Sequence, residues 1–322
     1  MKIFPAIILF FLLSISSFAQ RVSRTDYQKI QASEDTMKVY SWKIITGINS
    51  VDRFKADSIF TKALVRTLKT NNSFYYVFDS LQTISQLYAP DSSFRIFTWQ
   101  MLVNDRVVRQ HGAIQMRTDD GSMKLIPLID KSGVTVNIED SIGNNYGWMG
   151  AVYYKIVLTE SGTHKYYTLI GFNAGGISFD RKIVEVLTFV DGEPVFGGHY
   201  FSIPNDKLIP KSPARYVMEF KKDAVPRLTY DKDMQMILME HLISESNQPN
   251  KKYTMVGDGD YSGFKWQGGK WVFIDKVFAG MSTPEGQPPV PVPLGENHGG
   301  VREEEQGTPP VEKTKPASKK KN

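Results

Sequence analysis

Cysteine is absent from the 322-residue chain. This absence excludes disulfides, thiolate metal ligands and thiol nucleophiles, and it removes the side chain to which an exported protein attaches a lipid anchor. Without cross-links the fold has to depend on its hydrophobic core. About 260 ordered residues are ample for one large domain or two small ones.

The chain also lacks a dominant sign of charge. Its 39 Lys and Arg residues stand against 34 Asp and Glu residues, for a net charge of +5, and the basic residues are scattered along the sequence. A nucleic-acid-binding protein would cluster its Lys and Arg on one stripe. We therefore expect no nucleic-acid partner.

Long apolar runs are scarce, and the clearest one lies at residues 3–13, directly after Met1 and Lys2. A positive start, an apolar core and a Ser-rich stretch ending in Ala19 form the order of a secretory signal peptide. The core is about half of the roughly 20 residues that a membrane-spanning helix needs. We expect cleavage before Gln20 and a periplasmic or secreted protein that is neither lipid-anchored nor membrane-spanning; an uncleaved anchor is the alternative.

Four parts follow from the composition: a signal peptide at 1–19, a helical N-terminal segment at 20–90, an antiparallel β domain at 91–280, and a tail at 281–322. The tail is rich in Pro, Gly, Glu and Lys and has almost no large apolar residue to bury, which predicts disorder. We expect a solvated tail, with an electrostatic tether to anionic lipid or polysaccharide as the alternative.

The N-terminal segment has helical periodicity. The clearest helix follows Ser50, a candidate cap, and carries apolar residues spaced by three and four from Phe60 to Leu68. An earlier stretch containing Tyr27, Ile30, Met37, Ile44, Ile45 and Ile48 predicts another helix, although residues 39–42 suit an extended strand equally well. A third, short helix is expected between Asp79 and Pro90.

From residue 94 onward the apolar period changes to two, and Gly-containing turns such as Asp191-Gly192 and Gly268-Gly269 separate the runs. The predicted strands are 94–103, 107–117, 123–129, 150–158, 164–172, 182–190, 194–201, 215–220, 227–230, 234–240, 252–256, 263–267 and 270–278. Connections this short cannot hold crossover helices. The fold class is therefore α+β and mostly β, with N-terminal helices packed on a large antiparallel meander that forms a barrel or a sandwich; a propeller is less favoured because no blade repeat is visible.

Three blocks of sequence carry a resemblance: residues 73–99, residues 182–197 (KIVEVLTFVDGEPVFG) and residues 258–278 (DGDYSGFKWQGGKWVFIDKVF). On these aromatic strand cores and glycine turns, the chain resembles a family of exported, signal-peptide-bearing proteins of Bacteroidetes-type bacteria that has no assigned activity. The resemblance covers most of the chain except the tail. It implies an exported protein and assigns no catalytic residue.

A calcium loop is the best local motif for metal binding. Asp258, Asp260 and Ser262 alternate as oxygen donors before Gly263, as at the start of a helix-loop-helix calcium site. The twelfth position is Gly269 instead of the bidentate Glu, which excludes that class and leaves a looser loop site or an ordinary Asp/Gly turn.

The five histidines, at positions 111, 164, 199, 241 and 298, show no pair at metal-ligand spacing, so zinc is not expected. The segment GISFD at 176–180 lacks the closing glycine of a nucleophile elbow. We therefore name no catalytic residue.

One loop suits ligand binding. Tyr146 and Trp148 stand among glycines and asparagines at 143–148, close to the paired carboxylates Glu139 and Asp140, and rings among amides favour sugar stacking. The alternative is a surface loop with Trp148 in the core. The sequence favours a non-enzymatic exported protein that interacts with an envelope protein or a glycan. The second candidate is a periplasmic hydrolase that acts on glycan or peptide through carboxylates that their spacing in the sequence does not identify.

Overall fold

The computed structural model describes residues 22–104, 107–175, 178–204 and 211–278. They all belong to one unit, Met1–Thr283, and the second unit, Pro284–Asn322, lies outside the described residues. The predicted signal peptide and the predicted disordered tail lie outside them too.

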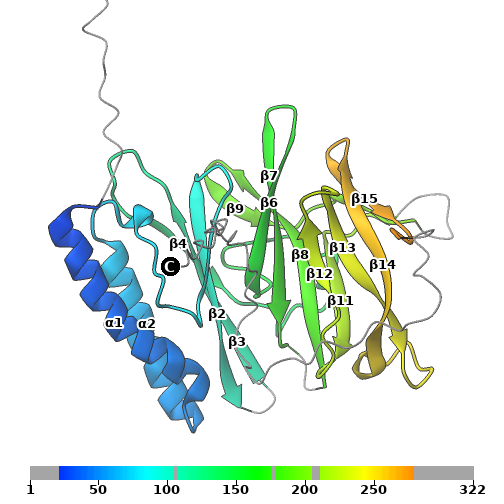
Figure 1. Ribbon diagram of the computed structural model, residues 1–322, viewed down its shortest axis with the longest axis horizontal. Helices are drawn as coiled ribbons and strands as arrows, with labels where there is room; N and C mark the ends of the chain where they lie inside the picture. The colour runs from blue at the N-terminus through cyan, green and yellow to red at the C-terminus, as the bar shows by residue number, and fades with distance from the viewer. Residues whose placement is uncertain (1–21, 105–106, 176–177, 205–210, 279–322) are drawn as a thin grey trace, which may run out of the picture. The chain divides into compact units, whose positions relative to one another are not determined.

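Two helices open the described chain and pack side by side (Figure 1). Helix α1 (Arg24–Thr46) is capped by Ser23, whose side chain accepts the backbone N–H of Asp26, and it includes residues 39–42. Helix α2 (Ser50–Leu68) is capped by Asn49, whose side chain accepts the N–H of Asp52. The predicted cap, Ser50, is thus the first helical residue, because Asn49 has the extended backbone that a cap requires.

The buried stripes of both helices cover the first sheet. Ile30, Met37 and Ile44 of α1 and Phe60 and Leu64 of α2 share one apolar cluster with Phe97, Trp99 and Met101. The predicted helices are confirmed. Three of the apolar residues expected for the first helix, Tyr27, Ile45 and Ile48, are instead exposed, and Ile48 lies beyond the end of α1.

The predicted third helix at 79–87 is wrong: strand β1 (Ser85–Tyr88) forms there. Buried side chains bind the backbone and side chains of the preceding segment. Arg95 donates to the carbonyls of Ser73 and Tyr76, and Glu34 accepts from both the N–H and the hydroxyl of Ser80. These bonds hold the segment in turns and a short 3-10 helix, η2 (Ser73–Tyr75). β1 then pairs with the free edge of the next strand, which outweighs the local helical pattern.

The first sheet is a meander of β1, β2 (Phe94–Asn104), β3 (Val107–Met116) and β4 (Lys124–Ile129). Side chains of β2 alternate between two cores, because successive residues of a strand point to opposite faces. Phe97 and Trp99 face the helices, and Phe94 and Ile96 belong to a second cluster shared with the next sheet.

The second sheet has the order β5-β9-β8-β7-β6, and β11 also pairs with β8. Its strands are β5 (Gly143–Asn144), β6 (Val152–Ser161), β7 (His164–Asn173), β8 (Phe179–Val190), β9 (Glu193–Phe196) and β11 (Arg215–Lys221). Both faces of β8 are buried: Ile183 and Leu187 contribute to one cluster, and Val184 and Val186 contribute to another. Burial on both faces explains the near-continuous apolar run of this strand.

The third sheet has the order β10-β15-β14-β13-β12. It consists of β10 (Phe201–Ser202), β12 (Leu228–Asp231), β13 (Met236–Ser244), β14 (Met255–Gln267) and β15 (Lys270–Ile274), with the 3-10 helix η3 (Lys252–Thr254) before β14. The predicted strand 252–256 is mostly wrong, because residues 252–254 form η3, whereas the predicted strand 263–267 is the end of the longer β14. The short β10 runs parallel to β15, an exception to the antiparallel pairing.

Three apolar clusters connect these layers. One lies between helices and first sheet, one between first and second sheets, and one between second and third sheets (Figure 1). The described strands form open sheets and no closed barrel. The predicted class, mostly β with N-terminal helices on antiparallel strands, is confirmed, and of the two favoured arrangements the stacked sheets correspond to the sandwich.

Candidate functional site

A hollow lies along the segment between β4 and β6, beside β5. Its volume is about 670 Å³. We call it the 131–149 groove. Its lining residues are Lys131, Val134, Thr135, Ser141, Ile142, Gly143, Asn144, Tyr146, Gly147, Met149 and Val195.

Backbone hydrogen bonds hold the two ends of this segment together. The N–H of Ile129 donates to the backbone carbonyl of Asn145, and the N–H of Lys131 donates to that of Trp148, each at 2.7 Å. At the turn, the chain doubles back so closely that a side chain on Gly143 would collide with the carbonyl of Gly147. A glycine is therefore required at position 143, where the chain reverses direction.

Tyr146 projects from this turn into solvent, with 68% of the residue exposed. Its position is fixed by its own N–H, which donates to the side chain of Asn144 at 3.0 Å. Val134 and Ile142, which also line the groove, are 75% and 53% exposed. The groove thus offers one aromatic face and two aliphatic side chains beside hydroxyl and amide groups.

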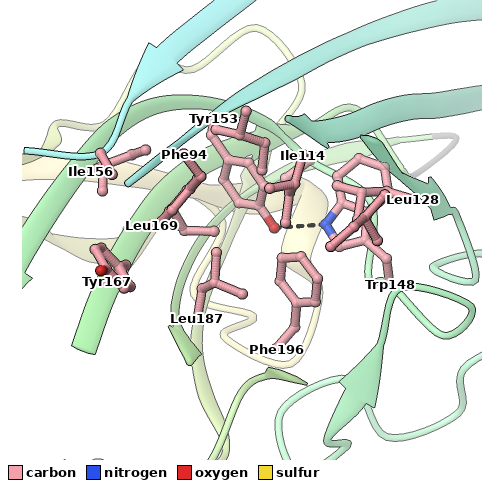
Figure 2. Close-up of a cluster of buried hydrophobic side chains, with 14 of the residues drawn as sticks. Phe94, Ile114, Leu128, Trp148, Tyr153, Ile156, Tyr167, Leu169, Leu187 and Phe196 are labelled. Atoms are coloured by element: carbon pink, nitrogen blue, oxygen red, sulfur yellow. Dashed lines mark hydrogen bonds between the residues drawn. The ribbon is translucent and has the colours of Figure 1, made fainter. Parts of the chain in front are cut away.

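Trp148, the second predicted ligand residue, lies in the core instead. It is fully buried, and its Nε1 donates to the hydroxyl of Tyr153 at 2.7 Å (Figure 2). Figure 2 shows the two rings packed among Ile114, Leu128 and Phe196. Trp148 therefore occupies the core, as in the alternative given for it above.

The hydrogen bond from Trp148 continues into a buried ion pair. The Tyr153 hydroxyl donates to Glu185 of β8, and the other carboxylate oxygen of Glu185 lies 3.0 Å from Nε of Arg215 on β11. Both charged side chains are fully buried. Burial, together with the neighbouring Glu185 carboxylate, raises the pKa of Tyr153 well above its ordinary value. Tyr153, Glu185 and Arg215 are all buried, and none of them lines the groove.

Arg215 also holds the chain that leads into the groove. Its backbone N–H donates to the carbonyl of Glu139 at 3.0 Å, and its guanidinium donates to the carbonyl of Ile138. Sequence reasoning missed Arg215 and Glu185, because each stands alone in its own segment. One signal was available: Glu185 interrupts the run KIVEVLTFV, and a charge in a strand buried on both faces requires a buried partner.

The paired carboxylates Glu139 and Asp140 are not among the groove-lining residues. Glu139 forms an ion pair with Lys211 at 2.7 Å, and its hydrogen bond raises the pKa of that lysine. Asp140 accepts from the side chain of Asn137 at 3.0 Å. The two carboxylates therefore bind separate partners.

The calcium candidates lie within strand β14, and the expected turn is absent. Between Glu240 and Leu242 the register of β13 against β14 shifts, so that residues 258–260 of β14 form a β-bulge opposite His241. Asp258 accepts from the N–H of Asp260 at 3.0 Å and lies 2.6 Å from Nδ1 of His241, whereas Ser262 donates to Asp275. Among the described residues no three His, Asp or Glu side chains gather as a metal site requires.

The described histidines occupy separate environments. His111 stacks on Trp99 with 5.5 Å between ring centroids, and its Nδ1 lies 3.7 Å from Asp57. Burial lowers the pKa of His111, although Asp57 opposes that effect. His199 Nδ1 lies 2.6 Å from the carbonyl of Ser212, His164 begins β7, and position 298 lies outside the described residues.

Comparisons with known proteins add no relative. No protein-family model, curated protein or solved structure matches the chain.

Proposed function

We propose that the protein is an exported, non-enzymatic binding protein that holds a glycan in the 131–149 groove. The observation that carries this proposal is the exposed Tyr146, whose backbone N–H donates to Asn144, in the lining of a hollow of about 670 Å³. An aromatic face stacks on the apolar face of a sugar, while neighbouring amides and hydroxyls bond to its hydroxyl groups.

The chemistry of the lining supports binding over hydrolysis. Among the described residues that line the groove, Lys131 is the basic side chain, and no carboxylate is present. A glycosidase uses two carboxyl groups that flank the bond to be cleaved. The runner-up is a periplasmic hydrolase whose carboxylates cannot be identified from their spacing. If Glu139 and Asp140 served in that role, both would have to leave Lys211 and Asn137.

Affinity electrophoresis through gels that contain cell-envelope polysaccharides tests this function. Tyr146→Ala should weaken retardation about tenfold, which corresponds to about 1.4 kcal/mol and lies near the upper end of the range for one aromatic contact. Tyr253→Ala is the matched control, because Tyr253 is also exposed, at 45%, but lies at η3. Equal retardation of wild type and Tyr146→Ala would remove the groove as the binding site.

Export is the second part of the proposal, and it rests on the order of charge, apolar core and small residues at 1–19 together with the resemblance to exported Bacteroidetes-type proteins. Intact mass measurement of the protein from its native cells should give a chain that begins at Gln20. A mass that includes Met1 would contradict export through a cleaved signal.

A further inference from the structure

An apolar surface lies at the end of the molecule where α1 turns into α2. Its exposed side chains are Trp42, Ile45, Ile48, Val51 and Phe54. Ile48 is 94% exposed and Val51 is 72% exposed. The opposite side of the same helices already supplies Ile44 and Ala56 to the core. We call this second apolar face the helix-turn surface. A helix that covers a core normally turns polar residues to solvent, so this face indicates a contact with another apolar phase.

Side chains of Arg53 and Arg109 connect the helix-turn surface to β2 and β3. Arg53 donates to the carbonyl of Leu102 at 2.6 Å and to that of Gly47 at 2.7 Å. The guanidinium of Arg109 lies 5.5 Å from the ring centroid of Phe54. Leu102 and Val107, at 38% and 45% exposure, extend the apolar area. The surface is thus built from three segments that fix one another.

Basic residues outnumber acidic ones in the sequence that carries these apolar side chains. Between residues 38 and 55 the basic residues are Lys38, Lys43, Arg53 and Lys55, and the acidic residue is Asp52. Asp52 already accepts from the side chain of Asn49 at 3.0 Å. Arg109 adds a further positive charge beside Phe54. The local excess is therefore cationic.

We propose that the helix-turn surface docks the protein on an anionic lipid bilayer. In a bilayer interface, hydrocarbon lies directly beneath phosphate groups, so apolar side chains flanked by Lys and Arg match both layers at once. A protein partner would place polar groups of both signs around the apolar centre. Docking is to the surface only: in the described part of the chain, no helix is long and apolar enough to cross a membrane. This inference is independent of ligand binding in the 131–149 groove.

Vesicle flotation of the full chain that begins at Gln20 tests the proposal. Vesicles that contain phosphatidylglycerol in phosphatidylcholine should carry the protein upward, and pure phosphatidylcholine vesicles should carry much less. Ile48→Ser/Val51→Ser should lower the bound fraction at least about tenfold, because it removes the most exposed apolar groups. Lys43→Glu/Lys55→Glu should abolish the preference for phosphatidylglycerol.

The matched control is Val136→Ser/Val225→Ser, which removes two valines that are equally exposed but lie elsewhere. It should float like the wild type. All variants keep the basic residues at 319–321, so flotation that persists in Ile48→Ser/Val51→Ser would assign lipid binding to another part of the chain and overturn the proposal. Absence of flotation for the wild type would overturn it as well. Thermal unfolding of each variant checks that the fold is retained.

Discussion

Tyr146 and Trp148 are two positions apart, and they have opposite environments. Tyr146 is exposed to solvent, with its backbone N–H bound to Asn144, whereas Trp148 is fully buried and its side chain donates to Tyr153. Their roles differ accordingly: the tyrosine is available to a ligand, and the tryptophan holds the loop on the core. A Trp148→Ala variant would leave a large cavity, so loss of binding in it would report damage to the fold.

The Glu185–Arg215 ion pair yields a stability prediction. Arg215→Met should lower the free energy of unfolding by about 3–5 kcal/mol, because it leaves the fully buried Glu185 carboxylate without its cation. Arg215→Met/Glu185→Leu should recover most of that loss, since apolar residues often replace a buried pair without cost. Chemical denaturation followed by fluorescence measures both values.

Two outcomes would contradict this account of the pair. A loss below about 1 kcal/mol in Arg215→Met would place the pair among exposed ion pairs, whose contribution is that small. A double variant that is no more stable than Arg215→Met would show that the arginine acts through Ile138 and Glu139, and not through Glu185.

At the scale of elements, the sequence predicts strands well where alternation is regular. Strands β2, β3 and β7 lie within about one residue of their predicted bounds. Their residues follow the period of two that is typical of strands. Asp191-Gly192 and Gly268-Gly269 both adopt the positive φ that their hairpins require. The local sequence is therefore sufficient to predict these strands and turns.

Elements that depend on distant partners were not predictable in this way. β1 forms because β2 offers an edge, and the backbone before it is held by Arg95 and Glu34. Asp258-Gly259 has the composition of a turn, but β13 pairs on both sides of it and a bulge absorbs the two extra residues of β14. The same limit applies to the site: Tyr146 follows from loop composition, whereas Glu185 and Arg215 meet only through the register of β8 against β11.

On the scale of the whole molecule, the layers give each surface a different role. The first sheet is covered by helices on one face and by the second sheet on the other, so it contributes side chains to an apolar core on each face. The 131–149 groove is formed mainly by the connection between β4 and β6, and the helix-turn surface is formed by the end of α1, the start of α2 and the turn between them. Loops and turns held by a packed scaffold are where binding groups commonly lie. Together the two surfaces fit a protein that rests on a membrane and holds a glycan.

Chain-length analysis of the glycan is the most direct test of binding without cleavage. The polysaccharide that retards the wild-type protein is incubated with it, and the length distribution and reducing ends are then measured. We predict that both stay unchanged while Tyr146→Ala loses retardation. Shortened chains that no longer form with Glu139→Gln or Asp140→Asn would contradict the account and identify a hydrolase.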